Sequence, residues 1–447
     1  MIINRPKGTV DITDKDAKIW KYVEMVIDSV MEKYNYNYIR TPIFENSEVF
    51  HRGIGETTDI VTKETYDFKD RGERSLTLRP EGTAGVVRSY IENKMYGTHN
   101  LPVKVYYNGT MYRYERPQLG RNRELTQYGV EVLGSKDPMI DAEVISMALN
   151  VNKALGLKGN KAHVNSLGDK ESRDNYRKAL KDYFRPHLDD LCDDCKARFE
   201  KNPLRIIDCK VDNNKDYFKK VPSILDYLNK ESKEYFDKVC EYLDILKVDY
   251  VIDDKIVRGL DYYNHTVFEI LADIPSFGNA NTLGGGGRYD GLVSELGGPE
   301  TSCVGYAVGI DRVVMALKEE KVDMPIKENV DAYILYVNED EKKNAVYIAD
   351  ELRRAGYVVE TDYNNKSLKA QFKRADYFDS SYLIILNSDD LNEGVVTIKN
   401  NKTKEEEKVE MEYLIYYFDE HIDDNFEDNG DDCDCSDCSC HNHEKEV

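Results

Sequence analysis

The chain lacks the features that would place it in a membrane or outside the cell. Among its 447 residues, no apolar run approaches the roughly 20 that a membrane-spanning helix needs. The segment from Met1 to Pro6 has neither the apolar core nor the small-residue cleavage site of a secretory signal. We therefore expect a cytoplasmic protein without a membrane partner, and we expect its nine cysteines to be reduced thiols.

Two common catalytic signatures are also missing. The glycines at 284–287 suggest a phosphate-binding loop, but no Gly-Lys-Ser or Gly-Lys-Thr follows them. The run instead favours a strand stripped of side chains, against which substrates can lie. No Ser-His-Asp or Cys-His nucleophile is evident.

The acidic balance of the chain argues at first against a nucleic-acid partner. The formal net charge is −22, whereas phosphate binding needs cations. Half of that charge comes from residues 419–447, which hold twelve acidic side chains and one lysine. The body carries the other half together with local clusters of arginine, which is compatible with binding one nucleic acid selectively and others poorly.

The cysteines form only half of a zinc ribbon. Cys192 and Cys195 have the spacing of metal ligands, and Cys209 and His187 lie close enough in sequence to complete a site. A second Cys-x-x-Cys is missing nearby. Two interpretations stay open, a zinc site or reduced cysteines beside a packed loop.

A basic segment lies between two apolar stretches. Residues 113–123 hold four arginines and one glutamate, and apolar residues flank them at 103–107 and 130–133. This pattern predicts two strands joined by a long basic loop. We expect Arg113 and Glu115 to point to one face of a strand, where they could hold an anion and an amino group. A solvated, salt-bridged hairpin is the alternative.

Four further segments stand out. They are Thr77–Thr83 (TLRPEGT), Val257–Glu269 (VRGLDYYNHTVFE), Gly284–Leu292 (GGGGRYDGL) and Gly305–Arg312 (GYAVGIDR). In this order, with the basic segment, they resemble the motifs of class II aminoacyl-tRNA synthetases, and within that class the histidyl-tRNA synthetases. The resemblance extends from about residue 1 to residue 418.

The resemblance implies an ATP-dependent histidine–tRNA ligase. Such an enzyme activates L-histidine with ATP and Mg²⁺ to histidyl-adenylate and transfers it to the 3′ end of tRNA(His). The alternative is a regulatory paralogue, of the kind found as the regulatory subunit of ATP phosphoribosyltransferase, which binds histidine without aminoacylation. That paralogue lacks an anticodon-binding domain, whereas this chain has a further domain at 330–418 and keeps Arg258 and Arg116–Gln118.

Matching positions imply roles at the ATP site. Arg113 and Arg258 would be the catalytic residues, directed at the amino-acid carboxylate and the α-phosphate. ATP would also contact Glu115 through the adenine amino group, Arg121, and Arg312 through the γ-phosphate.

The basic loop would also face the tRNA. The resemblance implies that Arg116, Gln118 and Arg123 meet the acceptor end. Leu125 stands where the family has a phenylalanine that stacks on adenine. We therefore expect Leu125 to form an apolar wall only.

Histidine recognition requires a carboxylate and hydroxyls that address both ring nitrogens. The matching candidates for the imidazole are Glu81, Tyr263 and Tyr289. We expect Tyr262 and Tyr263, as neighbours on a strand, to face opposite ways. The full set of expected histidine contacts is Glu81, Thr83, Arg113, Gln127, Glu131, Arg258, Tyr262, Tyr263 and Tyr289, of which Thr83, Gln127 and Glu131 would hold the α-amino group.

The expected fold is mixed α/β. Residues 1–320 would form a class II catalytic domain around an antiparallel sheet, interrupted by a mostly helical insertion at 170–250. In the family this insertion lies near the tRNA acceptor arm, and a packing role alone is the alternative. A helix from about Thr13 and a strand at 38–45, broken by Pro42, resemble the dimer motif of the class, which implies a homodimer.

Residues 330–418 alternate between strands and helices. Strands at 332–337, 357–360 and 382–386, with a helix ending at Gly356 and another at 367–378, predict a small α/β domain with parallel pairing. It resembles the anticodon-binding domain of several class II synthetases.

Residues 419–447 form an acidic tail without periodicity, which we expect to be disordered. The tail could bind zinc or another thiophilic metal, because it gathers six soft ligands within eleven residues: Cys433, Cys435, Cys438, Cys440, His441 and His443.

Overall fold

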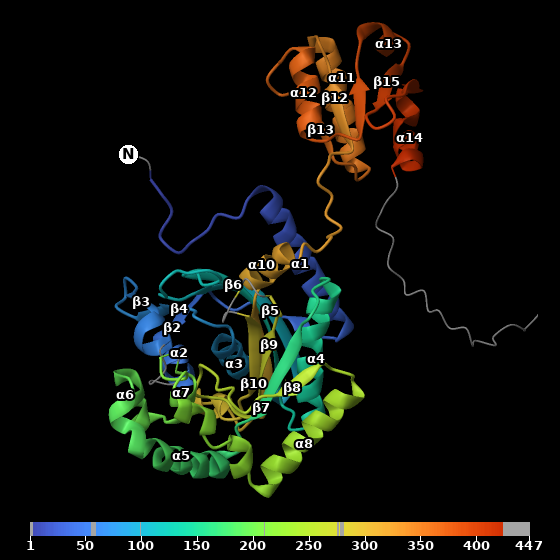
Figure 1. The fold of residues 1–447 in the computed structure, drawn as a ribbon. Helices are drawn as coiled ribbons and strands as arrows, with labels where there is room; N and C mark the ends of the chain where they lie inside the picture. Colours follow the sequence, from blue (N-terminus) through green and yellow to red (C-terminus); the bar gives the residue numbers. More distant parts are fainter. Residues whose placement is uncertain are drawn as a thin grey trace, which may run out of the picture. The chain divides into compact units, whose positions relative to one another are not determined.

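The computed structural model describes residues 3–54, 60–98, 100–209, 211–274, 277 and 281–422. The chain divides into two compact units, Met1–Ile326 and Lys327–Val447, and each has its own apolar core (Figure 1). The six expected metal ligands of the tail lie outside the described residues. No helix of the described residues is long and apolar enough to cross a membrane.

The first unit is built on an eight-stranded sheet. Its six central strands pair antiparallel, and a short strand joins parallel at each edge. In spatial order the strands are β1 (Asn37–Tyr38), β5 (Val103–Tyr112), β6 (Glu124–Leu133), β11 (Cys303–Gly309), β10 (Thr282–Arg288), β9 (Asn264–Leu271), β7 (Lys161–Ser166) and β8 (Tyr250–Ile252). This confirms the large antiparallel sheet that the motifs imply.

One face of the sheet is covered by four helices. They are α1 (Asp14–Lys33), α4 (Pro138–Ala154), α8 (Lys230–Ile245) and α10 (Ile310–Glu319). Asp137 begins α4 by accepting a hydrogen bond from the amide of Met139 at 2.9 Å, and Pro138 occupies the first turn. Val130 and Val132 of β6 are buried under these helices, so Glu131 between them points to the opposite face.

The opposite face carries α3 (Thr83–Glu92), α9 (Leu292–Glu295) and a small antiparallel sheet with α2 (Ser47–Ile54) beside it. The small sheet has the order β2 (Phe44–Asn46), β4 (Ser75–Leu78) and β3 (Tyr66–Lys69). The strand expected at 38–45 is interrupted at its proline, as predicted, but its two parts are short and do not share a sheet. Strand β1 joins the large sheet before Pro42, and β2 joins the small one after it.

The chain between β7 and β8 is mostly helical. It contains α5 (Lys170–Phe184), α6 (Asp193–Lys201), α7 (Leu204–Ile207), α8, and 3₁₀ turns at Arg185–Asp190, Asp216–Lys220 and Ile224–Tyr227. Tyr176, Leu180 and Phe184 recur at helical spacing and bury one side of α5. Shorter turns elsewhere are a π-helical turn at Ile60–Glu64 and 3₁₀ turns at Met95–Gly97 and Met411–Tyr413.

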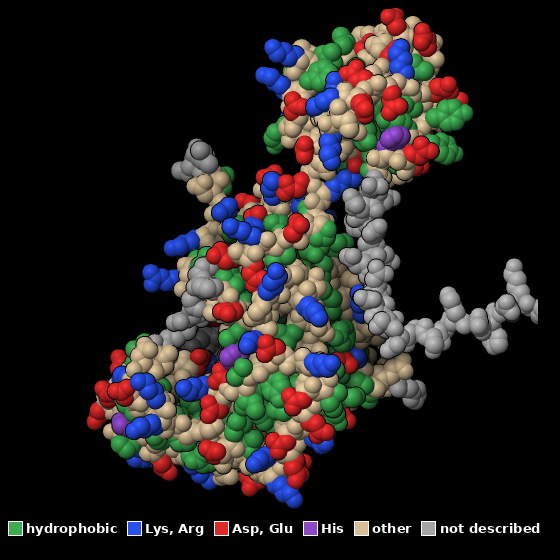
Figure 2. All heavy atoms as spheres, turned by 45° about the vertical axis from the view of Figure 1, so that its right-hand side comes forward, with side chains coloured by type: hydrophobic (Ala, Val, Ile, Leu, Met, Phe, Trp, Pro, Cys, Tyr) green, Lys and Arg blue, Asp and Glu red, His purple; other side chains and the backbone are tan. Residues whose placement is uncertain are grey.

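The second unit confirms the expected parallel pairing. Strand β12 (Ala332–Leu335) lies between β13 (Val359–Thr361) and β14 (Tyr382–Ile385), with α11 (Glu339–Arg354) and α12 (Leu368–Tyr377) in the connections. The sequence prediction missed β15 (Val395–Asn400), β16 (Glu406–Glu410), α13 (Ser388–Asn392) and α14 (Leu414–His421). Because α14 continues to His421, the aperiodic tail begins later than residue 419. Acidic and basic side chains are interspersed on both units in Figure 2.

Candidate functional site

Glycines line the sheet face that is opposite α4. A Cβ atom added at Gly285 would lie 2.4 Å from the carbonyl oxygen of Phe268 and 2.9 Å from Nη1 of Arg258. A Cβ atom at Gly305 would lie 2.0 Å from Oε2 of Glu131. The side chains of Arg258 and Glu131 therefore lie directly over bare backbone on this face.

Glu131 lies at the centre of a cluster of polar side chains on this face. Its side chain is fully buried; Thr83 donates a hydrogen bond from Oγ1 to its Oε1 at 2.7 Å, and the Tyr289 hydroxyl donates to its Oε2. Burial raises the pKa of the Glu131 carboxyl to about 8, although these two hydrogen bonds oppose the rise. A ligand cation placed here would favour the ionised form.

Glu81 is held by the start of α3. Its two carboxylate oxygens accept the backbone amides of Thr83 at 2.7 Å and Ala84 at 2.9 Å. Burial raises the pKa of the Glu81 carboxyl. Since each carboxylate oxygen has a further lone pair, Glu81 can still accept from a ligand.

The tyrosines depart from the expected geometry. Tyr262 and Tyr263 lie in the turn before β9 and not on a strand, and both rings are buried, with centroids 4.6 Å apart. The expectation that they face opposite ways is wrong, because strand alternation does not apply to a turn. The Tyr262 ring also meets the Tyr289 ring edge-on at 5.6 Å.

Sequence reasoning missed Tyr107. It lies opposite Gly129 on the neighbouring strand, and a Cβ atom at Gly129 would be 2.4 Å from its hydroxyl. Burial and the carboxylates of Glu131 and Glu81 raise its pKa. On the same face of β6, Gln127 has a buried Oε1 that forms no hydrogen bond with any described residue.

Arg258 lies over the glycines of β10. Its Nη1 is 2.6 Å from Oε1 of Glu269, and Thr282 donates to the other oxygen of Glu269 at 3.1 Å. Burial lowers the pKa of Arg258, but Glu269 and the neighbouring tyrosines outweigh it and the net shift is upward. Glu269 is the last residue of the segment 257–269, and its sequence position alone gives no sign of this pairing.

Three guanidinium groups gather around one carboxylate beside Arg258. Glu115 lies 3.9 Å from Arg113 and 3.3 Å from Arg121, counted between the nearest charged atoms. Arg312 donates to the carbonyl oxygens of Gly120, at 3.1 Å, and of Thr282. Burial and the charges of Arg121 and Arg113 lower the pKa of Arg312, so this cluster has an excess of positive charge.

Arg113 and Glu115 do not lie on a strand, contrary to expectation. Strand β5 ends at Tyr112, and Arg113 is instead fixed by donating from Nε to the carbonyl oxygen of Pro80 at 2.8 Å. The pairing of β5 with β6 confirms the predicted hairpin, and residues 113–123 form its loop.

The residues expected at the tRNA end of the loop differ in exposure. Arg116 and Gln118 are exposed. Arg123 packs its guanidinium on the Tyr114 ring, 3.9 Å from the centroid, and donates from Nε to the carbonyl oxygen of Glu115 at 3.2 Å. Leu125 is half-buried against the apolar core of this face.

Comparison with known proteins decides the family. The family model for histidyl-tRNA synthetase matches residues 8–313, and a model for an anticodon-binding domain matches residues 331–421. A histidine–tRNA ligase of Anoxybacillus flavithermus is 52% identical over 410 residues, which cover 92% of this chain and 97% of that protein. The chain belongs to the histidyl-tRNA synthetase family.

Solved structures agree with membership of the histidyl-tRNA synthetase family. The apo histidyl-tRNA synthetase of S. aureus superimposes with a TM-score of 0.80 at 41% identity, covering 93% of this chain and 100% of that one. A Bacillus halodurans protein described as an ATP phosphoribosyltransferase regulatory subunit/histidyl-tRNA synthetase has a TM-score of 0.62 at 21% identity and covers 87% of this chain and 100% of its own. The second likeness shows a shared fold alone. Together the relatives favour the ligase over the regulatory paralogue.

Proposed function

We infer that the chain activates L-histidine with ATP and joins it to tRNA(His). The observation that carries this inference is the continuous set of contacts across one glycine-lined face. Thr282 links the arginine cluster to Arg258, because its carbonyl oxygen accepts from Arg312 while its hydroxyl donates to Glu269, the partner of Arg258. The Arg258 guanidinium lies 5.8 Å from the centroid of the Tyr263 ring, and Tyr262 packs between that ring and Tyr289, which contacts Glu131. Cations suited to a triphosphate therefore adjoin polar groups suited to an amino acid.

The arginine cluster is suited to ATP. Arg113, Arg121 and Arg312 outnumber the one carboxylate of Glu115, and bound phosphate would remove the repulsion among them. We assign Arg312 to the γ-phosphate and Glu115 to the adenine amino group. Mg²⁺ would enter with ATP; Glu269 offers a carboxylate oxygen of the kind that fits it, and the ion would neutralise phosphate charge.

The second group is suited to histidine. Glu131, Thr83 and Gln127 present buried acceptor oxygens for the α-ammonium group. Glu81, with Tyr263 and Tyr289, would address the imidazole nitrogens. These buried side chains would discriminate histidine from other amino acids, because an amino acid that leaves a buried polar side chain without a hydrogen bond binds less favourably.

The chemistry consists of two displacements. A carboxylate oxygen of histidine attacks the α-phosphorus of ATP, the P–O bond to the leaving group breaks, and pyrophosphate departs with its electron pair. Arg113 and Arg258 oppose the charge that develops at the α-phosphate. A ribose hydroxyl at the 3′ end of tRNA(His) then attacks the carbonyl carbon, AMP leaves, and the hydroxyl proton goes to the departing phosphate or solvent.

We assign the remaining parts of the chain by the same reasoning. Residues 1–320 would hold the chemistry and residues 330–418 the anticodon, while Arg116, Gln118 and Arg123 would meet the acceptor end. Cytoplasmic location follows from the substrates, which are ATP and tRNA.

We propose a homodimer that covers the face of the small sheet on which two phenylalanines lie. Phe44 on β2 and Phe68 on β3 are 53% and 42% exposed, and their rings pack together at 6.3 Å. Replacing Phe44 with glutamate should weaken the dimer, measured by sedimentation, and an unchanged dimer would place the interface elsewhere.

We also propose that the cysteines and histidines at 433–443 bind zinc without a part in catalysis. Deleting residues 425–447 should lower bound metal and leave aminoacylation unchanged. Loss of aminoacylation would show that the tail takes part in it.

Pyrophosphate exchange tests the main proposal. The purified protein should exchange pyrophosphate into ATP when L-histidine is present and with no other common amino acid, and it should charge tRNA(His). Histidine binding without exchange would instead support the regulatory paralogue.

A further inference from the structure

A buried cluster in the helical insertion is not used by the proposed reaction. Cys192 immediately precedes α6, Cys195 lies in the first turn of that helix, and Cys209 and Asp212 follow α7. One ligand atom from each of these four residues lies within 4.8 Å of the other three. Cys195, Cys209 and Asp212 are buried, and Cys192 is half-buried.

Two separations between ligand atoms match tetrahedral coordination. With zinc–sulfur bonds of about 2.3 Å, two sulfur ligands lie about 3.8 Å apart, and a sulfur and an oxygen ligand about 3.6 Å apart. Sγ of Cys192 and Sγ of Cys209 are 3.7 Å apart, and Sγ of Cys209 is 3.7 Å from Oδ2 of Asp212. A disulfide requires sulfur atoms about 2.05 Å apart, so these thiols are not bonded to each other.

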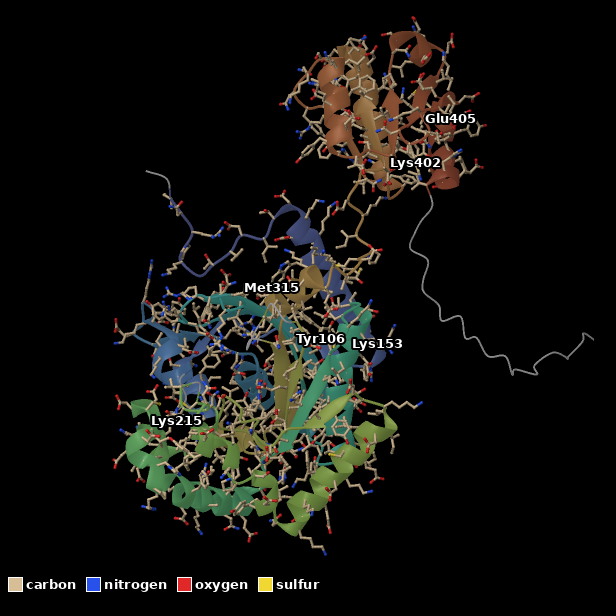
Figure 3. All side chains as sticks on the ribbon, in the orientation of Figure 1. Tyr106, Lys153, Lys215, Met315, Lys402 and Glu405 are labelled. Carbon is tan, nitrogen blue, oxygen red and sulfur yellow. The ribbon has the colours of Figure 1, made fainter. Side chains whose placement is uncertain are left out.

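The surroundings fit a metal with a carboxylate ligand. Asp212 directs Oδ2 toward the cysteines, and its Oδ1 lies 2.9 Å from Nζ of Lys215, which Figure 3 labels in the insertion. An outer cation of this kind orients a ligating carboxylate and offsets part of the charge of a thiolate-rich site. The amide of Cys192 also donates to Oδ2 at 3.0 Å, which fixes the carboxylate relative to the start of α6.

The fourth ligand differs from the one that spacing suggested. His187 stacks on the Tyr217 ring at 4.1 Å and does not belong to the cluster. Asp212, three residues beyond Cys209, takes its place.

We propose that Cys192, Cys195, Cys209 and Asp212 form a structural zinc site. On binding, each thiol releases its proton to solvent and the thiolate donates an electron pair to the metal, so no oxidant or reductant is needed. Four protein ligands leave no open position, which makes the site structural rather than catalytic.

The bound zinc would tie together the two ends of the segment from Cys195 to Cys209. Within that segment Asn202 donates to Oδ1 of Asp261 at 3.1 Å, and Arg205 donates to the carbonyl oxygen of Arg258 at 3.1 Å. Zinc would therefore steady the backbone of Arg258 from outside the reacting site. This consequence, unlike the metal site itself, rests on the proposed function.

The test uses the full chain with Cys433, Cys435, Cys438 and Cys440 replaced by serine, so that the tail cannot supply thiolates. Elemental analysis of this parent protein should find about one zinc per chain. Adding Cys209→Ser should abolish the bound zinc, whereas adding Cys240→Ser, a cysteine on α8 outside the cluster, should leave it unchanged.

Cobalt provides a readout that does not require a folded variant. Stripping the parent of metal and adding Co²⁺ should produce the intense visible and thiolate charge-transfer bands of a tetrahedral thiolate site. No zinc in the parent, no such bands, zinc retained by Cys209→Ser, or a Cys192–Cys209 disulfide found by mass spectrometry would each overturn the proposal. Histidine-dependent pyrophosphate exchange is measured on the same samples. Zinc without exchange would contradict the proposed function alone, and exchange without zinc would contradict the metal site alone.

Discussion

Replacing Glu131 with glutamine should make the first unit more resistant to heat at alkaline pH while weakening its binding of histidine. The two side chains have nearly the same shape, and Thr83 and Tyr289 can both hydrogen-bond to an amide. The substitution therefore removes one titrating proton and little else.

The size of the effect follows from the raised pKa. Burial raises the pKa of Glu131 from its ordinary 4.5 to about 8, so between these values the folded protein holds a proton that the unfolded chain has released. The contribution of this carboxyl to stability is greatest below pH 4.5 and falls as the pH rises toward about 8. The loss is about 1.4 kcal/mol per pH unit well below pH 8, or roughly 2 kcal/mol between about pH 6 and pH 8, because the folded carboxyl is itself half ionised at the upper value. Glutamine does not titrate and avoids this loss.

Differential scanning calorimetry, which measures the melting temperature, tests this prediction at about pH 6 and about pH 8. The quantity to compare is the melting temperature of Glu131→Gln minus that of the unaltered protein. This difference should be several degrees larger at about pH 8 than at about pH 6, since roughly 2–4 °C corresponds to 1 kcal/mol in a domain of moderate size. Glu124→Gln, at the start of the same strand, is the matched control and should show no such change. An equal difference at both pH values would mean that Glu131 is not protonated in the folded protein.

The affinity for histidine should rise with pH, whereas the contribution of Glu131 to stability falls with pH. An α-ammonium group beside Glu131 lowers its pKa, so binding should release a proton and strengthen by up to tenfold per unit between about pH 7 and pH 8. Calorimetric titrations in buffers of different ionisation enthalpy count that proton. In Glu131→Gln the affinity should be lower and lose most of this pH dependence.

Three further changes test other parts of the site. Arg258→Ala should lower kcat for histidine-dependent exchange by about a hundredfold or more with little change in histidine affinity, and Arg258→Lys should rescue it only in part; exchange that survives Arg258→Ala would remove its catalytic assignment. Glu81→Gln should raise the KM for histidine far more than that for ATP, because a charge-assisted hydrogen bond contributes roughly 1.5–3 kcal/mol, and equal effects would place Glu81 outside the imidazole contacts. A chain ending at Ile326 should still form adenylate but charge tRNA(His) poorly; full charging would give residues 330–418 another role.

The sequence could predict elements whose pattern is local. The apolar stretches around the basic loop predicted β5 and β6, and alternating strands and helices predicted the parallel core of the second unit. The charged strand β16 was missed because four of its five residues are charged, which is typical of a solvated edge strand and resembles a loop in sequence.

Contacts between side chains of different strands and loops could not be predicted from the sequence. Tyr107 faces Gly129 only because β5 and β6 pair in one register, and Glu269 meets Arg258 across a turn of unpredictable path. Asp212 joins the cysteines because α6 and α7 fold back on each other. Its spacing from Cys209 would have been a weak signal, since acidic residues are abundant in this region.

The contacts from Asn202 and Arg205 bear on how the insertion can vary. An insertion between two strands usually behaves as a separable accessory that can be exchanged among relatives. Here it supports the carbonyl of Arg258 and the carboxylate of Asp261 directly. A transplanted insertion would have to bring equivalent donors at those two points, so the insertion and the turn that carries Arg258 and Asp261 are constrained to change together.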